Sequence, residues 1–241
     1  MKDLRLITIT LAMMTFVACG PIQRTRQSED TPVRTPETEN LLINLKKVSA
    51  RGFMFGHHDD TNYGIGWEGD EGRSDVKSVC GDYPAVISFD LGHIELGDTM
   101  SLDKVPFTKI RKEILNQYKR GGMSSLSWHL RNPLTGGDSW DVSDTTVVKS
   151  ILPGGANHEK FTGWVSKVSA FINSLQTEEG VKVPVLFRPW HEHTGSWFWW
   201  GEKLCTPEEY KALWHMTVDI LRNDGVDNAL YAYSPGSEPQ D

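Results

Sequence analysis

Long apolar runs, basic clusters and cysteine are all scarce in this sequence of 241 residues. The apolar stretch at residues 6–17 covers about a dozen positions, whereas a helix that crosses a membrane needs roughly 20. The formal net charge is −7 and no run of Lys and Arg stands out, so nothing favours a nucleic-acid partner. Charged residues make up 24% and hydrophobic residues 38% of the chain, which is typical of a globular protein and excludes a disordered one.

The N-terminal segment has the layout of a bacterial lipoprotein signal. Lys2 and Arg5 provide a positive region before the apolar stretch, which ends in the sequence V-A-C-G. We therefore expect residues 1–18 to be a signal peptide and Cys19 to be lipidated, so that the exported protein is anchored at the cell envelope, in the periplasm or at the outer membrane. A plain signal peptide with a chance Cys is the alternative. Residues 19–40 are polar and contain Pro, and we expect a flexible tether there.

From about residue 50 onward, short apolar strands alternate with amphipathic helices. Runs of β-forming residues predict buried parallel strands over residues 52–56, 85–90, 122–129, 183–188 and 229–234. Helical periodicity and start signals predict helices over residues 74–79, 107–120, 160–176 and 207–221. Alternation of this kind predicts βαβ units wound in one direction, as in a barrel or in a doubly wound sheet.

Two features favour an α/β fold of the (β/α)8 TIM-barrel type over a doubly wound sheet. The phosphate-binding pattern G-x-G-x-x-G is absent after the first predicted strand. Polar side chains follow most strands at the carboxyl end, where barrel enzymes keep their sites: His57, His58, Asp59, Asp90, His93, His129, His191 and Glu192. The chain holds about five of the eight βα units that a closed barrel needs.

The two cysteines beyond the signal segment are expected to be free thiols. Cys80 precedes a predicted strand, whereas Cys205 lies in a loop that follows one. In a parallel fold these positions are at opposite ends of the sheet, and a disulfide needs a Cα separation of roughly 4.4–6.8 Å. An exported protein could otherwise pair them.

Residues 183–200 carry the clearest chemistry. The apolar strand ends in a segment that contains Glu192, and four aromatic residues follow at Trp197, Phe198, Trp199 and Trp200. A glycosidase needs a carboxyl group at the mouth of a strand, where low-dielectric surroundings help such a group to keep a proton for the leaving oxygen. Aromatic faces stack on sugars. The alternatives are a salt bridge to Arg188 and core packing of the aromatics, and at least one of the last two Trp residues is expected to be core.

The segment RPWHEHTGSWFWW, residues 188–200, closely resembles the acid/base motif of glycoside hydrolase family 26, best known for endo-β-1,4-mannanases. Shorter similarities follow the family's order: FGHH at 55–58, SFDLG at 88–92, WHLRNP at 128–133 and YSP at 233–235. The resemblance implies a (β/α)8 barrel with a retaining mechanism, in which the acid/base follows the fourth strand and the nucleophile follows the seventh. Residues 41–241 would then be a partial catalytic barrel that needs no cofactor or metal.

The same resemblance assigns roles to individual residues. Glu192 is implied to be the catalytic acid/base and His191 its sugar-binding neighbour. Trp197 is similar to a stacking platform at the cleavage point, His129 to a contact of the sugar being cleaved, and Trp140 to a further platform. The implied partner is a β-mannan polysaccharide or oligosaccharide, cut at its β-1,4-mannosidic bonds in mannan, glucomannan or galactomannan.

The second catalytic group departs from the family pattern. A retaining glycosidase needs two carboxyl groups roughly 5–5.5 Å apart, and the family's nucleophile lies further along the chain than Asp241. Glu238 has no predicted strand before it and is not expected to substitute. Asp90, at the end of the second strand, is interpreted as bracing the site. We therefore expect the chain to be an inactive fragment without its nucleophile.

Other interpretations remain open. Another β-glycanase of the same family would cut mixed-linkage β-glucan or β-1,3-xylan. A non-catalytic glycan-binding lipoprotein would use the same cleft, although five-eighths of a barrel leaves sheet edges exposed. The long loop 131–158 is interpreted as a rim of the cleft, with a solvated surface insertion as the alternative. A metal-dependent hydrolase would use imidazole and carboxylate groups at the strand ends: His57, His58, Asp59, His129, His191 and His193.

Overall fold

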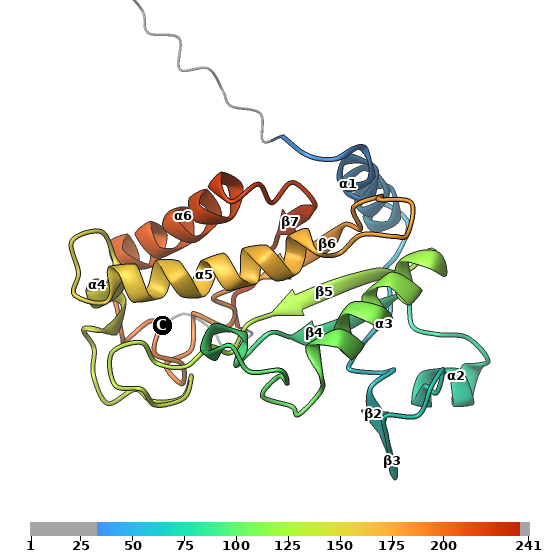
Figure 1. Cartoon of the computed structure of the whole chain (residues 1–241), viewed down its shortest axis with the longest axis horizontal. Coiled ribbons are helices and arrows are strands. Elements are labelled where there is room, and N and C mark those ends of the chain that lie inside the picture. Colours follow the sequence, from blue (N-terminus) through green and yellow to red (C-terminus); the bar gives the residue numbers. More distant parts are fainter. Residues whose placement is uncertain (1–32, 237–241) are drawn as a thin grey trace, which may run out of the picture. The chain divides into compact units, whose positions relative to one another are not determined.

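A five-stranded parallel sheet forms the centre of the computed structural model, which describes residues 33–236 (Figure 1). Its strands pair in chain order, each with its neighbour in the sequence of strands. They are β1 (Gly56–His58), β4 (Val86–Asp90), β5 (Met123–Ser127), β6 (Val185–Arg188) and β7 (Ala229–Tyr231). This order confirms the predicted sequential winding of βαβ units.

The predicted strands β4, β5 and β6 are confirmed within two residues, but the first is wrong in position and the last is shorter. Residues 52–55 lie outside any strand, and the rings of Phe53 and Phe55 are 87% and 56% exposed. Ladder pairing of β1 begins at Gly56, which lies opposite Val86. β1 is the edge strand of the described sheet, so it has a strand neighbour on one side only. The apolar residues 52–55 predicted a buried strand, but no strand of the described sheet beside them completes that burial.

The four predicted helices are confirmed, with bounds that differ from the prediction by up to three residues. They are α2 (Asp75–Cys80), α3 (Phe107–Lys119), α5 (His158–Asn173) and α6 (Pro207–Asn223). The Ser74 side chain accepts a hydrogen bond from Lys77 N at the start of α2. At the start of α6, Thr206 and Glu209 form a reciprocal capping box, with Pro at the first helical position.

Helix α1 (Pro36–Ser49) contradicts part of the expected tether over residues 19–40. Thr35 caps the helix by accepting a hydrogen bond from Thr38 N, and Pro36 suits the first turn. The backbone N–H of Thr35 also donates to the carbonyl of Asp227, 3.1 Å away, just before β7. The polar composition hid this start signal. The predicted signal peptide and tether residues 19–32, including Cys19, lie outside the described residues.

Three smaller elements were not predicted. The hairpin β2 (Tyr63–Gly64) and β3 (Trp67–Glu68) lies in the segment between β1 and α2. The 3-10 turn η1 (Ile94–Leu96) follows β4, and α4 (Val147–Ile151) interrupts the long loop between β5 and α5. Each of these segments follows the carboxyl end of a strand, so they lie at the end of the sheet where the polar residues gather.

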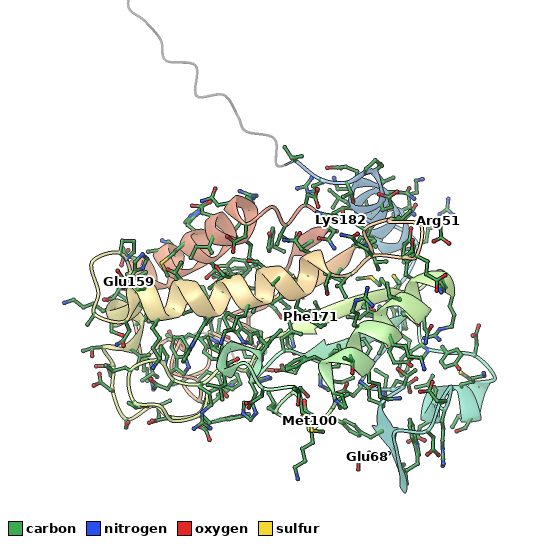
Figure 2. All side chains as sticks on the ribbon, viewed as in Figure 1. Arg51, Glu68, Met100, Glu159, Phe171 and Lys182 are labelled. Atoms are coloured by element: carbon green, nitrogen blue, oxygen red, sulfur yellow. The ribbon has the colours of Figure 1, made fainter. Side chains whose placement is uncertain are left out.

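The two faces of the sheet differ in polarity. Alternate residues such as Ile87, Phe89, Leu126, Val185 and Phe187 are fully buried in the main hydrophobic core, which also includes side chains of α3, α5 and α6. One helix-to-helix contact in this core joins the rings of Phe171, labelled in Figure 2, and Phe107, whose centroids are 6.0 Å apart.

The residues between those core positions face the opposite side. They pair in register as Ser88 with Ser125, Asp90 with Ser127 and Ser127 with Arg188. This second face therefore carries a polar row that crosses the strands toward their carboxyl ends.

The prediction for the two cysteines can be compared with the structure. Cys80 and Cys205 are free thiols, as predicted. Within residues 33–236, no helix is both long enough and apolar enough to cross a membrane.

Candidate active site

The loop after β6 holds Glu192 in a constrained backbone conformation. Trp190 and Glu192 have φ values of +54° and +56°, a region that non-glycine residues seldom occupy. The backbone N–H of Glu192 donates to the carbonyl of Ser234, 2.7 Å away, beyond the end of β7. Trp190 is fully buried. The loop is thus held in the core by Trp190 and is joined by Glu192 to the segment after β7.

The Glu192 carboxylate accepts a hydrogen bond from an aromatic neighbour. Trp197 Nε1 lies 3.0 Å from Glu192 Oε2, and its ring is 37% exposed. The ring packs directly on Gly195, where any Cβ would collide with it. Arg188 instead donates to Ser234 Oγ at 3.1 Å, and among the described residues Glu192 makes no salt bridge with it. The interpretation of Glu192 as one half of a structural ion pair is therefore not supported.

The aromatic segment divides into a buried base and an exposed platform. Trp199 and Trp200 are both fully buried, which agrees with the expectation that at least one of them belongs to the core. Trp200 Nε1 donates to the carbonyl of His191 at 2.9 Å, which anchors the loop from below. Trp197 and Trp140 remain accessible, the latter 51% exposed. The accessible rings are the two predicted as sugar platforms.

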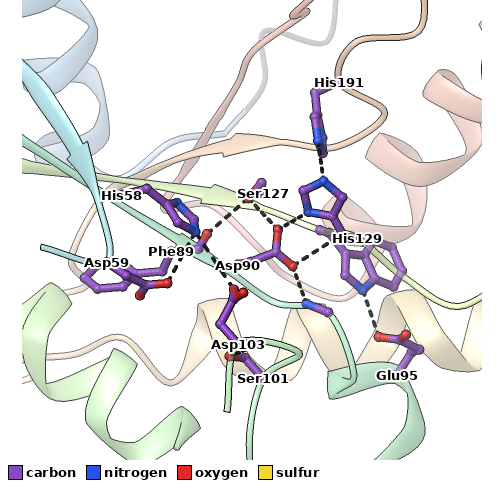
Figure 3. Close-up of polar contacts among 12 residues, drawn as sticks. His58, Asp59, Phe89, Asp90, Glu95, Ser101, Asp103, Ser127, His129 and His191 are labelled. Atoms are coloured by element: carbon purple, nitrogen blue, oxygen red, sulfur yellow. Dashed lines mark hydrogen bonds and ion pairs between the residues drawn. The ribbon is translucent and has the colours of Figure 1, made fainter. Parts of the chain in front are cut away.

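Asp90 is the centre of a buried hydrogen-bond network on the polar face (Figure 3). Its Oδ2 accepts from Ser127 Oγ at 2.6 Å and contacts His129 Nδ1 at 2.7 Å. Its Oδ1 accepts from the backbone N–H groups of Gly92 at 2.7 Å and His129 at 3.1 Å. Burial by itself would raise the pKa of Asp90, but the hydrogen bonds and charge of its neighbours outweigh burial and hold that pKa well below its usual range.

His129 and His191 continue this network. Their Nε2 atoms lie 3.0 Å apart, and His191 is 1% exposed. Burial, with His129 and Arg188 nearby, lowers the pKa of His191 to about 3, so His191 is neutral near pH 7. The opposite edge of His129 is occupied by Asp90, so both of its ring nitrogens have partners in the protein.

The predicted substrate-binding residues come together around Phe198. Trp140 stacks on His129 with ring centroids 5.4 Å apart and an interplanar angle of 10°. Phe198 lies 5.2 Å from His129, 5.3 Å from His191 and 6.3 Å from Trp197. The structure thus brings all four predicted substrate-binding residues and Glu192 into one cluster of contacts, in which His191 is buried and Trp140 and Trp197 are accessible.

The histidines and carboxylate considered for a metal do not all converge. Within residues 33–236, the group whose ligand atoms lie within 4.8 Å of one another is His58, Asp59 and Asp103. His129 contacts Asp90 and His191 instead, and the ring of His193 stacks on Tyr210 with ring centroids 4.4 Å apart. Burial raises the pKa of Asp59 to about 6.

Sequence reasoning did not single out three residues that support this site. Ser127 was hidden in a strand, although its register beside Asp90 brings its hydroxyl to the carboxylate. Phe198 belongs to a run of four aromatic residues, and nothing in the sequence distinguishes it from its neighbours. Glu95, 1% exposed, accepts hydrogen bonds from Trp128 Nε1 at 3.0 Å and the backbone N–H of Arg131 at 2.8 Å, so it ties η1 to the segment after β5.

A family model described as Glycosyl hydrolase family 26 matches residues 31–241. The chain belongs to this family. The match covers every described residue and includes Glu192, its aromatic neighbours and the Asp90 network. The five sequential parallel strands of this chain correspond to about five of the eight βα units of the family's (β/α)8 barrel.

Family 26 proteins with known names and structures match over most of this chain. A mannan endo-1,4-beta-mannosidase from Bifidobacterium adolescentis is 36% identical over 208 residues, which is 84% of this chain and 20% of the relative. The structure of a β-mannanase from Bacteroides ovatus is similar with 66% identity and a TM-score of 0.84, covering 86% of this chain and 60% of that one. An endo-β-1,4-mannanase from Cellulomonas fimi has 36% identity and a TM-score of 0.77, with 85% and 46% covered.

This chain therefore spans only part of the length of each of these family 26 proteins. A Bacillus subtilis mannan endo-1,4-beta-mannosidase shows the same relation, since the match covers 83% of this chain and 57% of the relative. The shared part contains the segment with Glu192, so the comparison bears directly on the site described above.

Proposed function

We propose that the protein is a retaining β-mannanase that hydrolyses β-1,4-mannosidic bonds in mannan, glucomannan or galactomannan, with Glu192 as the acid/base. The observation that carries the proposal is the carboxylate of Glu192 beside the accessible ring of Trp197, next to the His129–Trp140 stack. A proton donor beside aromatic platforms is what cleavage of a glycosidic bond requires. The names of the family 26 relatives point to the same substrate.

In the proposed mechanism, Glu192 first protonates the leaving oxygen and later takes a proton from the water that releases the product. The nucleophile must be a second carboxylate. Asp90 is not available for this role, because both of its oxygens accept hydrogen bonds and it is 2% exposed. Asp59 and Asp103 lie beside His58. We assign only the acid/base role among the described residues, and the activity is proposed for the whole protein.

Substitution of Glu192 tests the assignment. Glu192→Ala should lower the rate on mannan by about 10²–10⁴-fold, because the unactivated leaving sugar then departs without a proton. An aryl mannobioside with an acidic leaving phenol should lose much less in its first step, and added azide should yield a β-mannosyl azide. Equal losses on both substrates would contradict an acid/base role.

Glu202→Gln is the matched control, because Glu202 is an exposed carboxylate in the same loop. Its rate on both substrates should equal that of the wild type. If mannan is not cut but mixed-linkage β-glucan or β-1,3-xylan is, the activity belongs to another β-glycanase of the family.

Binding measurements separate an enzyme from a glycan-binding protein. Trp197 and Trp140 are accessible, so mannohexaose should quench their fluorescence, and the double variant Trp140→Ala/Trp197→Ala should lose most of this change. Binding without turnover by the whole protein would favour a non-catalytic glycan-binding function.

We also propose that the protein is exported and anchored by lipid at Cys19 to the cell envelope. The support is the charged, apolar and V-A-C-G order of the N-terminal segment. Radiolabelled palmitate should be incorporated into the wild type and not into Cys19→Ser, which should also leave the membrane fraction. Equal labelling of both proteins would rule out this anchor.

A further inference from the structure

The hydrogen bonds around Asp90 determine where the protons of two histidines lie. Two backbone N–H groups and one hydroxyl donate to its carboxylate, and the remaining contact, at 2.7 Å, is His129 Nδ1. An ionised carboxylate only accepts hydrogen bonds. His129 must therefore carry a proton on Nδ1.

When both imidazoles are neutral, the contact between them has one consistent assignment. Only one proton fits between the Nε2 atoms of His129 and His191, 3.0 Å apart. His129 Nε2 is bare once its proton lies on Nδ1, and two bare nitrogens 3.0 Å apart would face each other without a hydrogen bond. Among the described residues, His191 Nδ1 has no hydrogen-bond partner of good geometry, although the nearby Arg188 carbonyl favours a proton on this ring. The contact between the rings therefore places the proton of His191 on Nε2, where it is donated to the bare Nε2 of His129.

We propose that Asp90 is a positioning residue that sets the tautomers of both histidines, His129 as Nδ1–H and His191 as Nε2–H. Through this chain a buried carboxylate on β4 orients His191, the residue that directly precedes Glu192. The proposal deepens the proposed function, and only its kinetic consequence rests on that function.

The geometry predicts what an isosteric substitution does. In Asp90→Asn the amide oxygen takes the position of Oδ1, because the amide NH₂ group cannot face the two backbone N–H donors there. The NH₂ group then faces His129 Nδ1, which can accept its hydrogen bond only when bare. His129 becomes the Nε2–H tautomer and donates to His191, whose proton moves to Nδ1. One substitution thus inverts both tautomers.

Histidine tautomers can be measured without any turnover. We would label the histidines of the full chain with ¹⁵N, assign His129 and His191 from His129→Gln and His191→Gln, and record long-range ¹H–¹⁵N spectra at neutral pH. The wild type should show His129 as Nδ1–H and His191 as Nε2–H, and Asp90→Asn should show the reverse. A wild-type His129 that carries a proton on Nε2, or unchanged tautomers in folded Asp90→Asn, would overturn the proposal.

Two further variants keep the test decisive. Asp98→Asn removes an exposed carboxylate 3.8 Å from His93, and should leave the spectra of His129 and His191 unchanged. Ser127→Ala removes a different donor to the same Asp90 oxygen, and should keep both wild-type tautomers. If Asp90→Asn does not fold, the wild-type and Ser127→Ala spectra still decide, since an Nε2–H form of His129 in either contradicts the assignment.

The kinetic measurement uses the whole protein on mannan. A wrong histidine tautomer in an intact site can lower kcat strongly, and we expect a fall of about 10²-fold in Asp90→Asn with a smaller change in KM. If the wild type does not cut mannan, the proposed function fails while the spectra still test the tautomers. Inverted tautomers with unchanged kcat would remove the positioning role.

Discussion

Trp197 combines two interactions that a single substitution can separate. Its indole N–H donates to Glu192 and its exposed face is free for a sugar. Trp197→Phe keeps an aromatic face and removes the donor, so kcat should fall by about 10-fold, the usual scale for a hydrogen bond to a charged group, while KM changes little. Trp197→Ala should raise KM as well. Steady-state kinetics on mannan measure both effects.

Trp67→Phe is the matched control for Trp197→Phe. Trp67 Nε1 also donates to a carboxylate, Asp75 Oδ1 at 2.7 Å, but this pair joins the β2–β3 hairpin to α2. Its loss should leave kcat and KM unchanged. An equal kinetic loss in both variants would mean that the effect of Trp197→Phe is a general loss of stability.

Helix α6 begins with a reciprocal cap. Thr206 Oγ1 accepts from Glu209 N at 3.2 Å, while Glu209 Oε2 accepts from Thr206 N at 2.9 Å. Thr206→Ala should lower the free energy of unfolding by about 1 kcal/mol. Thr108→Ala, at an exposed position near the start of α3, should change it by less than about 0.5 kcal/mol. Urea unfolding compares them, and equal losses would contradict the capping role.

Two buried groups make the stability of the whole molecule sensitive to acid. The pKa of His191 is about 3 in the folded state, whereas an unfolded His titrates near 6.5. The unfolded chain therefore binds the extra proton, and stability falls as pH decreases from about 6.5 toward 3. The pKa of Asp90 is also lowered by folding, so its stabilisation is present above about 3.9 and is lost as pH falls below that value.

Asp59 has the opposite effect on how stability depends on pH. Its pKa is raised to about 6, so between that value and its ordinary one the folded state binds more protons and gains stability as pH falls. His191→Phe leaves both aspartates in place. Its thermal midpoint should therefore fall less than that of the wild type between pH 7 and pH 4, measured by circular dichroism, with the exposed His215→Phe as the control. Parallel curves for all three proteins would contradict the role of His191.

Much of this protein follows from local sequence. The start signal at Thr206 predicted where α6 begins, and apolar runs predicted β4, β5 and β6, because these signals depend on residues close together in the chain. The segment around Glu192 indicated the family by itself. The sequence misplaced β1 and missed α1, since the exposure of one and the docking of the other depend on distant partners.

Only the tertiary structure decided how the site is held together. Asp90 and His129 are 39 residues apart in the chain, and His129 and His191 are 62 apart, yet parallel pairing brings all three to one edge of the sheet. The same packing buries Trp199 and Trp200 and leaves Trp197 accessible. The sequence by itself determined which groups can do the chemistry. Their contacts and proton positions depend on strand register and burial, which no local pattern contains.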